Sequence, residues 1–366
     1  MMKVIFANRK DCMTSMGGDT VQMLLTKKYL EANHPVEVEL CFEPGELRSK
    51  KADLVHIFNV QTFKESRAFL EAANEMKCKT AISPIYWNMG YAVTAYAMTL
   101  LSLYKPRSVF RSIAPYLVRF TSGLSRERYL SRNYRKEIRY LLDHADVILP
   151  NSDTEKELLI EHFQPAAMHG FRVIPNAIEL TDEEVPSPLK KEENLIIQVG
   201  RISAAKNQAG TLHAAMDQPR LKVLIIGKVD EPRYDDYLHK IAGKRGNVEF
   251  IREIPQEALM RFYREAAVHM NPSFRDSPGL VTLEAFYQGC EIVVSEPAFV
   301  PLHYYRFDKE AHICNPFSVS SIRDALNNAL VNKKNTGTDN KDYFSFFNYR
   351  TVAELTYEAY LSAIKP

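Results

Sequence analysis

Two acidic side chains in the C-terminal half are spaced so that both can face one bound ligand. Asp276 and Glu284 are separated by seven residues, and Pro278 and Gly289 are typical of the first turn and the end of a helix. We therefore expect a helix that begins near Pro278–Gly279. The unpaired N–H groups of such a helix start attract anions, and carboxylates accept hydrogen bonds from hydroxyls. The segment predicts a site for a ligand with phosphates and hydroxyls, such as a nucleotide sugar.

Two permanent cations precede this segment in the chain. Arg201 and Lys206 follow the apolar run Asn194–Val199, on a predicted strand-to-helix loop. Arginine grips phosphate oxygens in a fork and lysine supplies a mobile point charge, and each charge-assisted bond contributes about 1.5–3 kcal/mol when sheltered from water. The pair suits a diphosphate. The competing interpretation is that both are hydrated surface side chains.

The carboxylates also have a structural interpretation. Asp276 could be a turn residue, and Glu284 could share a solvent-facing helix stripe with Gln288. The order of the segments favours the functional interpretation, because the cations follow the first strand of this half, Gly227 ends the second, and Pro272–Ser273 precedes the carboxylates. Groups for phosphates and groups for hydroxyls would then meet at one sheet edge.

Short β-branched runs recur between helix-like stretches along the whole chain. Near-continuous apolar strands that alternate with helices indicate parallel sheets covered on both faces. We therefore predict an α/β fold with two doubly wound, Rossmann-like domains. The expected strands are Met2–Ala7, Val36–Cys41, Asp53–Phe58, Lys79–Ser83, Ala145–Pro150 and Phe171–Pro175 in the first half, and Asn194–Val199, Leu221–Ile226, Asn247–Ile251, Ala267–Asn271, Glu291–Ser295 and Ala311–Cys314 in the second.

The boundary between the two domains is expected near Ile174–Ile178. The following segment, residues 179–193, is charged, contains prolines and lacks periodicity, as surface connections do. In open α/β sheets, ligands collect beyond the carboxyl ends of the strands. We expect the loops of the two domains to face each other across a cleft.

At these residues the second half resembles the donor domain of glycosyltransferase family 4 (glycosyl transferases group 1), a retaining family with the two-domain GT-B architecture. The similarity covers most of the chain. It implies an acceptor-side domain at residues 1–174, completed by a C-terminal helix at 345–366, and a donor domain at 175–344. The segments that carry it are Gly200-Arg201 to Lys206, 262–273, Asp276 to Glu284-Ala285 and Gly289, 293–295, 145–152, 173–179 and 344–360.

The resemblance implies a role for each matching residue. Arg201 and Lys206 would hold the donor diphosphate, Glu284 the ribose hydroxyls, and Asp276 a hydroxyl of the transferred sugar. The base would lie near Arg252–Ile254. The implied catalytic residues are Arg201, Lys206 and Asp276. The implied donor-binding residues are Gly200, Arg201, Lys206, Gly227, Arg252, Ile254, Asp276, Ser277, Gly279, Leu280, Val281 and Glu284.

The first carboxylate departs from the family pattern, which usually has Glu at this position. Asp276 is one methylene shorter, and we expect the donor sugar to be selected there. The resemblance implies a metal-independent hexosyltransferase or related enzyme without a cofactor, the nucleotide-diphosphate sugar being a co-substrate. The acceptor would be a glycan or a lipid-linked molecule in surface polysaccharide or glycoconjugate synthesis. Two alternatives to a transferase are left open: a nucleotide-sugar epimerase or hydrolase, and a non-catalytic sugar-nucleotide-binding subunit.

The first half offers fewer candidate residues. Gly17 and Gly18 follow the first predicted strand, where a glycine-rich loop would approach the diphosphate on the acceptor side. A structural turn explains the same pair equally well. Trp87 and Asn88 follow the fourth predicted strand and are candidates for acceptor recognition, since an aromatic ring there can stack on a sugar. The alternative for Trp87 is a position in the core.

A basic segment lies between Lys105 and Arg139. It contains ten Lys or Arg residues against only Glu127 and Glu137, interleaved with apolar side chains. Basic amphipathic segments can lie on anionic membranes, which would suit a lipid-linked acceptor. The alternative is the solvated face of a long helical insertion.

Composition sets broader limits. The 366 residues suit two domains, and a formal net charge of +2 gives no overall preference for nucleic acid. No apolar run is long enough to act as a signal peptide or to span a bilayer. We expect a cytoplasmic protein, with peripheral contact at the inner face of the membrane if the basic segment binds lipid. Five scattered cysteines without a Cys-x-x-Cys pair argue against disulfides and zinc: Cys12, Cys41, Cys78, Cys290 and Cys314.

Overall fold

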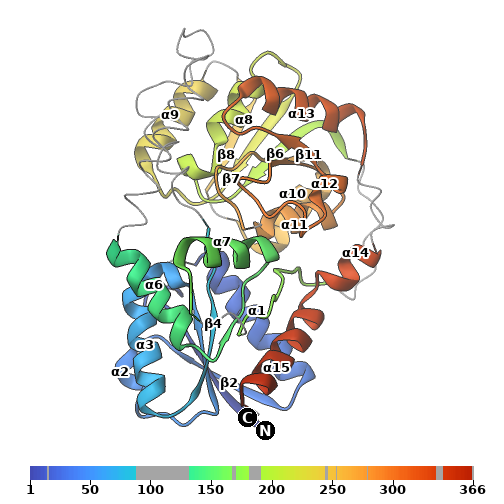
Figure 1. Cartoon of the computed structure of the whole chain (residues 1–366). Coiled ribbons are helices and arrows are strands. Elements are labelled where there is room, and N and C mark those ends of the chain that lie inside the picture. Colours follow the sequence, from blue (N-terminus) through green and yellow to red (C-terminus); the bar gives the residue numbers. More distant parts are fainter. Residues whose placement is uncertain are drawn as a thin grey trace. The chain divides into compact units, whose positions relative to one another are not determined.

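In the computed structural model, the chain forms two compact units of parallel α/β structure (Figure 1). Unit 1 comprises Met1–Trp87, Leu130–Leu180 and Asp342–Pro366, and unit 2 comprises Thr181–Lys341. The sequence placed the boundary six residues earlier, between 174 and 175. The structure describes residues 1–14, 16–87, 132–166, 170–180, 191–243, 246–252, 254–277, 279–334 and 341–364.

Unit 1 is built on a five-stranded sheet in the order β2-β1-β3-β4-β5, in which every pair of neighbours is parallel. The strands are short and apolar, and most of their side chains are buried because helices cover both faces of the sheet. They are β1 (Met2–Ala7), β2 (Val36–Cys41), β3 (Leu54–Phe58), β4 (Lys79–Ser83) and β5 (Val147–Ile148).

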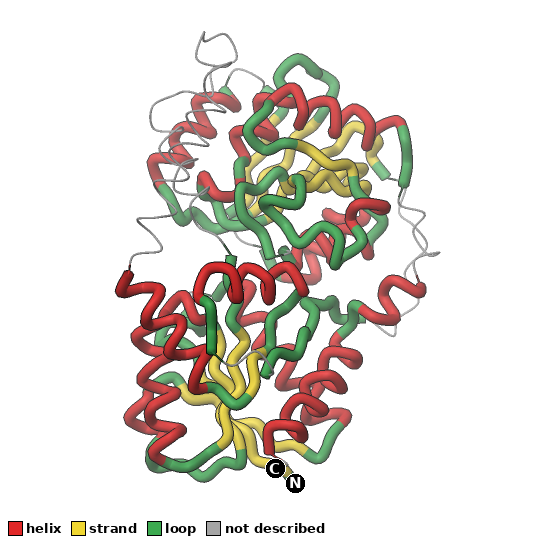
Figure 2. Tube along the Cα trace, viewed as in Figure 1, coloured by secondary structure: helices red, strands yellow, loops and turns green. Residues whose placement is uncertain are grey.

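The helices of unit 1 form two layers around its sheet. Helix α15 packs with α1 on one face, where the rings of Tyr29 and Tyr349 stack 5.9 Å apart, and α3 packs with α6 on the other (Figures 1 and 2). The C-terminal helix therefore belongs to the core of the first unit. The helices are α1 (Gly18–Asn33), α2 (Pro44–Leu47), the 3₁₀ turn η1 (Val60–Thr62), α3 (Phe63–Glu75), α6 (Arg132–His144), α7 (Asp153–Phe163), α14 (Lys341–Phe346) and α15 (Tyr349–Ile364).

Unit 2 has a six-stranded parallel sheet in the order β11-β10-β9-β6-β7-β8. Its central strand is apolar on both faces: Ile196 packs toward α8 and α13, and Ile197 packs toward α10 and α11. The strands are β6 (Glu192–Val199), β7 (Lys222–Ile226), β8 (Val248–Ile251), β9 (Ala266–Asn271), β10 (Glu291–Ser295) and β11 (His312–Cys314). The helices are η3 (Ala204–Lys206), α8 (Gln208–Ala214), α9 (Pro232–Ala242), α10 (Gln256–Glu265), α11 (Leu280–Tyr287), α12 (Phe307–Glu310) and α13 (Val319–Val331).

The predicted strand Phe171–Pro175 is wrong. The segment is extended beside β5 and makes a single bridge, from Phe171 to Ile148, with three flanking backbone hydrogen bonds. Pro150 lacks the N–H group that would continue the pairing toward Arg172, and β5 is correspondingly short. The remaining predicted strands agree with the structure to within two residues at each end, and β5 is two residues shorter than predicted at both ends.

The strand order indicates one position in each unit where a ligand is expected to bind. In unit 1 the chain continues from β1 to β2 on one side and then returns to β3 on the other, and in unit 2 strands β7 and β9 flank β6 in the same way. Such a reversal opens a crevice at the carboxyl ends of the two central strands, where ligands of doubly wound sheets bind. The crevices lie after β1 and β3, and after β6 and β9.

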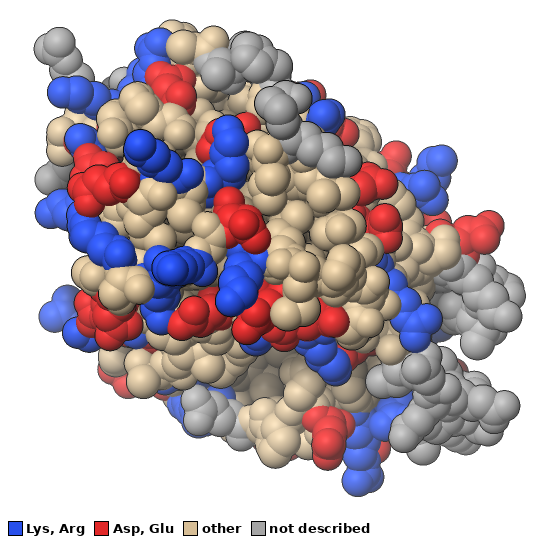
Figure 3. Space-filling view, turned by 90° about the horizontal axis from the view of Figure 1, so that it is seen from below, with Lys and Arg blue, Asp and Glu red and all other residues tan. Residues whose placement is uncertain are grey.

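Charged side chains are mixed on the surface in the view of Figure 3, where basic and acidic groups alternate. Many are paired, as in the ion pairs of Arg48 with Glu75 and of Lys27 with Glu31. Within the described part of the chain, every helix is too short or too polar to cross a bilayer.

Candidate functional site

The loop after β6 begins with a close approach between two strand ends. Gly200 has a φ of +145° and Gly227 a φ of +156°, both in a region that favours glycine. A Cβ added to Gly227 would lie 1.9 Å from the carbonyl oxygen of Gly200, so no other residue fits there. The predicted donor-binding residue Gly227 thus has a structural role in shaping this loop. Arg201 comes next, with a 60% exposed side chain whose Nη1 lies 3.0 Å from Asp230 Oδ2.

Lys206 ends the short η3 turn, and its backbone is fixed on several sides. Its N–H donates to Ser203 O at 3.0 Å, and its carbonyl accepts from Gln198 Nε2 at 2.7 Å. Asn207 follows in the left-handed conformation and donates from Nδ2 to Pro272 O and Pro316 O, both at 2.9 Å. The loop after β6 is thereby fastened to the loop after β9.

The Lys206 and Asp276 side chains meet across the crevice of unit 2. Lys206 Nζ lies 2.8 Å from Asp276 Oδ2, which also accepts from Asn271 Nδ2 at 2.7 Å. Asp276 Oδ1 accepts from the backbone N–H of Ser277 at 3.1 Å. The side chains of Lys206 and Asp276 are 22% and 8% exposed. Folding thus brings together the two charged residues that the sequence assigned to phosphate and to sugar.

Helix α11 begins beside this ion pair. Gly279 is its N-cap residue, and Leu280 is its first residue. The first N–H groups of a helix have no intrahelical acceptor, so Leu280 and Val281 present donors at this end. The helix start and the Gly289 end, where φ is +81°, confirm the prediction from sequence. Pro278 lies outside the described residues.

Glu284 lies on the second turn of α11 and is half-buried. Its Oε1 accepts from Gln256 Nε2 at 2.9 Å. Burial raises the pKa of the Glu284 carboxyl to about 7, and the hydrogen bonds it accepts oppose this rise. Tyr263 lies beside it, and burial together with the charge of Glu284 raises the pKa of the tyrosine hydroxyl. At neutral pH, this carboxyl group is close to its midpoint of ionisation.

His269 lies on β9, beneath the ion pair, and is fully buried. Its ring packs edge-on against Tyr263 with centroids 5.8 Å apart. Burial lowers the pKa of the imidazole to about 3, and the nearby Lys206 contributes to the decrease. His269 is therefore neutral.

The predicted base-binding residues are divided between a surface ion pair and the core. Arg252 binds Asp235 through two hydrogen bonds, Nη1 to Oδ1 at 2.8 Å and Nη2 to Oδ2 at 2.9 Å, and contacts His239 Nε2 at 2.9 Å. Ile254 and Val281 pack against the core layer under α10 and α11. Arg252 would have to release Asp235 before it could bind a base.

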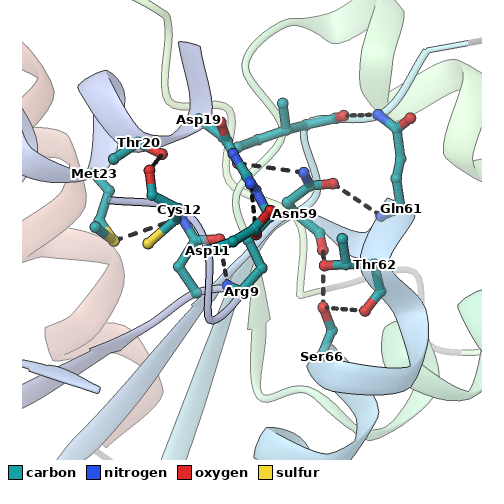
Figure 4. Close-up of polar contacts among 12 residues, drawn as sticks. Arg9, Asp11, Cys12, Asp19, Thr20, Met23, Asn59, Gln61, Thr62 and Ser66 are labelled. Atoms are coloured by element: carbon teal, nitrogen blue, oxygen red, sulfur yellow. Dashed lines mark hydrogen bonds and ion pairs between the residues drawn. The ribbon is translucent and has the colours of Figure 1, made fainter. Parts of the chain in front are cut away.

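A second polar cluster occupies the crevice of unit 1. Arg9 follows β1 and donates from Nε to Asp19 Oδ2 at 3.3 Å and from Nη1 to Asp11 Oδ1 at 2.7 Å (Figure 4). Asn59 follows β3 and donates from Nδ2 to the same Asp19 oxygen at 3.5 Å. Asp19 is only 9% exposed. The cluster joins the ends of β1 and β3 at the start of α1.

Gly17 and Gly18 stand at this helix start, as the N-cap and first residue of α1. A Cβ on Gly17 would lie 2.6 Å from Asp19 Oδ1, whereas a Cβ on Gly18 would meet nothing within 4 Å. Trp87 is only 1% exposed, which places it in the core. Asn88 and the basic residues 105–131 lie outside the described part of the chain.

Several residues of the two clusters were not predicted from the sequence: Arg9, Asp19, Asn59, Asn207, His269 as a neighbour of the ion pair, Asn271 and Gln256. Asn207 carried a local signal, since asparagine is one of the few residues that tolerate the left-handed conformation before a helix. The others carry no such signal, because polar residues at strand ends are common and only tertiary contacts distinguish them.

Comparison with known proteins matches residues 181–341 to the family model described as "Glycosyl transferases group 1", the same range as unit 2. Among curated proteins, the D-inositol 3-phosphate glycosyltransferase of Corynebacterium jeikeium is 28% identical over 204 residues, 49% of this chain and 47% of that protein. The chain thus spans about half the length of this relative.

Among solved structures, sucrose-phosphate synthase from Thermosynechococcus elongatus has a TM-score of 0.74 at 15% identity and covers 99% of this chain and 98% of its own. Anabaena HepE, in complex with UDP and glucose, has a TM-score of 0.67 at 14% identity. This match covers 99% of the present chain and 100% of the HepE chain. These similarities confirm the predicted fold class of two Rossmann-like domains.

Proposed function

We propose that this chain, whose residues 181–341 belong to the glycosyl transferases group 1 family, is a retaining, metal-independent glycosyltransferase that uses a nucleotide-diphosphate sugar. The observation that carries the proposal is the meeting of Lys206 and Asp276 beside the N-terminus of α11, in the crevice of unit 2. Cations and helix N–H groups suit phosphates, and carboxylates suit hydroxyls. Anabaena HepE, with the same fold, was solved with UDP and glucose.

In the proposed reaction, the bond between the anomeric carbon and the diphosphate oxygen breaks, and negative charge develops on the leaving diphosphate. Lys206, Arg201 and the first N–H groups of α11 would stabilise that charge as it forms. Arg201 is exposed and could turn from Asp230 toward a phosphate. The departing phosphate would accept the proton of the acceptor hydroxyl.

The donor would lie along α11. Glu284 would accept hydrogen bonds from the ribose hydroxyls, and the base would lie near Arg252 and Ile254. Asp276 lies at the other end, in contact with Lys206. This order follows the positions of the residues in the fold. Asp276 precedes α11 and Glu284 lies on it, whereas Arg252 and Ile254 lie on the loop between β8 and α10.

The acceptor would be a glycan or a lipid-linked molecule, in surface polysaccharide or glycoconjugate synthesis. Among the described residues of unit 1, we assign three features to the acceptor side of the reaction: Gly17, Gly18 and the cluster around Arg9. We assign the basic segment 105–139 to contact with an anionic membrane surface, from its ten cations and interleaved apolar residues. The cytoplasmic side of a membrane would then be its place of action.

The test is a turnover assay with a panel of UDP-, GDP- and ADP-sugars, followed as release of the nucleoside diphosphate. Lys206→Met keeps most of the aliphatic stem and removes the cation, and we expect it to lower kcat by about 100-fold or more. Lys240→Met, at an exposed position of α9, is the matched control and should retain wild-type turnover.

Wild-type kcat in Lys206→Met would contradict the assignment of the diphosphate site. Binding of a nucleotide sugar by the wild-type protein without transfer or slow hydrolysis would instead indicate a non-catalytic binding subunit.

A further inference from the structure

The Asp276 carboxylate is committed to contacts within the protein. Its Oδ2 accepts from Lys206 Nζ at 2.8 Å and from Asn271 Nδ2 at 2.7 Å, and its Oδ1 accepts from Ser277 N at 3.1 Å. A carboxylate oxygen has two lone pairs, so Oδ2 is fully occupied. The residue is only 7% exposed. A sugar hydroxyl would find one acceptor position at most.

Space around the carboxylate is limited as well. A Cβ on Gly279 would lie 2.7 Å from Asp276 Oδ2 and 3.1 Å from Oδ1, so the Gly279 backbone closes one side of the group. Asn271 is itself held, because it donates to Thr282 Oγ1 at 2.8 Å and accepts from Ser273 Oγ. Asp276 thus lies in a hydrogen-bonded cluster with Asn271, beside the start of α11.

Lys206 depends on this carboxylate for the position of its ammonium group. Its backbone is held by Ser203 and Gln198, and the neighbouring Ala205 carbonyl accepts from Phe274 N at 2.9 Å. Its methylene groups pass over Gly200, at ordinary van der Waals distances of 3.7–3.8 Å from a Cβ added there. Four rotatable bonds nevertheless leave the ammonium free to move unless a partner holds it. Asp276 is the partner that the structure shows.

We propose that Asp276 is a positioning residue: it holds the Lys206 ammonium where the donor diphosphate binds and does not select the transferred sugar. The inference rests on the proposed function. An ammonium has three donors, so Lys206 keeps two for phosphate oxygens while the third stays on Asp276. A cation placed beforehand loses less freedom when the ligand binds, and this favours both binding and turnover.

A nucleoside diphosphate lacks the transferred sugar, so its binding separates the two roles considered for Asp276. UDP, GDP and ADP are titrated into the full chain by calorimetry, and the nucleotide that binds is compared with its nucleotide sugar. We expect Asp276→Asn to weaken the free nucleoside diphosphate about tenfold, because the amide no longer holds the ammonium by charge. We expect Lys206→Met to weaken it at least as much, and the double variant to be no weaker than Lys206→Met alone, because both substitutions remove one interaction.

Wild-type or tighter binding of the free nucleoside diphosphate to Asp276→Asn, with a loss confined to the nucleotide sugar, would overturn the proposal in favour of sugar selection. Additive losses in the double variant would overturn it too. If the wild-type chain bound none of the three nucleotides, the proposed function itself would fail.

Asp276→Glu and Asp324→Asn complete the set. Asp276→Glu keeps the charge, so we expect it to recover most of the affinity and kcat that Asp276→Asn loses, a rescue that a merely structural loss would not show. Asp324→Asn removes an exposed carboxylate on α13 and should bind as the wild type does. The thermal midpoint of each ligand-free variant shows that the fold is intact, and absence of rescue in a folded Asp276→Glu would count against positioning by charge.

Discussion

The charge of Glu284 is set by its surroundings on the second turn of α11. Its pKa rises to about 7 chiefly because part of the carboxyl group is removed from water, although the hydrogen bond from Gln256 opposes the rise. An ionised carboxylate offers acceptors to two ribose hydroxyls, whereas the neutral acid also carries a proton that must find an acceptor. Ligand binding should therefore favour the ionised form.

We predict that the affinity for a nucleotide sugar rises by up to about tenfold from about pH 6 to pH 8, since a group with a pKa near 7 ionises over this interval. The nucleotide sugar is the appropriate ligand because its diphosphate stays ionised throughout. Calorimetric titrations at a series of pH values measure the effect. Glu284→Gln cannot ionise and should bind weakly with a flat profile, and an unchanged slope in this variant would exclude Glu284 as the source.

At the scale of elements, one lysine joins the ends of two helices. Lys191 precedes β6, and its Nζ donates to Ala266 O at 2.8 Å and to the carbonyls of Tyr263, Arg264 and Gln288 at 3.3–3.4 Å. The last carbonyls of α10 and α11 lack intrahelical partners, and a cation satisfies them and the negative end of the helix dipole. Both helices carry residues of the candidate site, so this contact supports its geometry.

We predict that Lys191→Met lowers the free energy of unfolding by about 1–3 kcal/mol, because the stem still packs but the carbonyls lose their donor. Urea denaturation followed by circular dichroism measures this change. Lys240→Met, exposed on α9, should change stability by less than about 0.5 kcal/mol. Equal stability of the two variants would show that water replaces the ammonium at no cost.

At the scale of the whole molecule, the net charge of +2 conceals an uneven distribution. Many of the cations that the structure describes are paired with nearby carboxylates, as in the pairs of Arg67 with Glu71 and of Arg48 with Glu75, and basic and acidic groups alternate in Figure 3. The segment 105–139 has ten cations and two acidic residues. Its attraction to an anionic surface would therefore depend on this local excess and would decrease with salt.

We predict that the protein sediments with vesicles that contain anionic lipid, binds neutral vesicles less, and is released as the salt concentration rises. Replacement of Lys105, Arg107, Arg111 and Arg119 by Gln should abolish the difference between the two vesicle types. The matched control replaces the exposed Lys51, Lys64, Lys240 and Lys309 by Gln and should sediment as the wild type does. Equal binding to neutral and anionic vesicles would contradict the prediction.

Much of the fold could be predicted because strands buried on both faces must be apolar throughout. The runs that became β1, β2, β4 and β10 were located to the residue. Phe171–Pro175 failed because its pairing depends on N–H groups that Pro150 lacks, in a different segment. The start and end of α11 were predictable because Gly279 and Gly289 act locally, whereas Asn271 gave no local sign that it would hold Asp276.

The sequence by itself determined the α/β class, the alternation of strands and helices, and which charged residues follow which strands. These properties follow from local hydrophobicity and backbone preference. Only the tertiary structure decided that β6 lies beside β9, and hence that Lys206 meets Asp276 from 70 residues away. Strand order depends on the packing of whole helices onto the sheet, and the use of each carboxylate oxygen depends on contacts of a few ångströms, which no local pattern encodes.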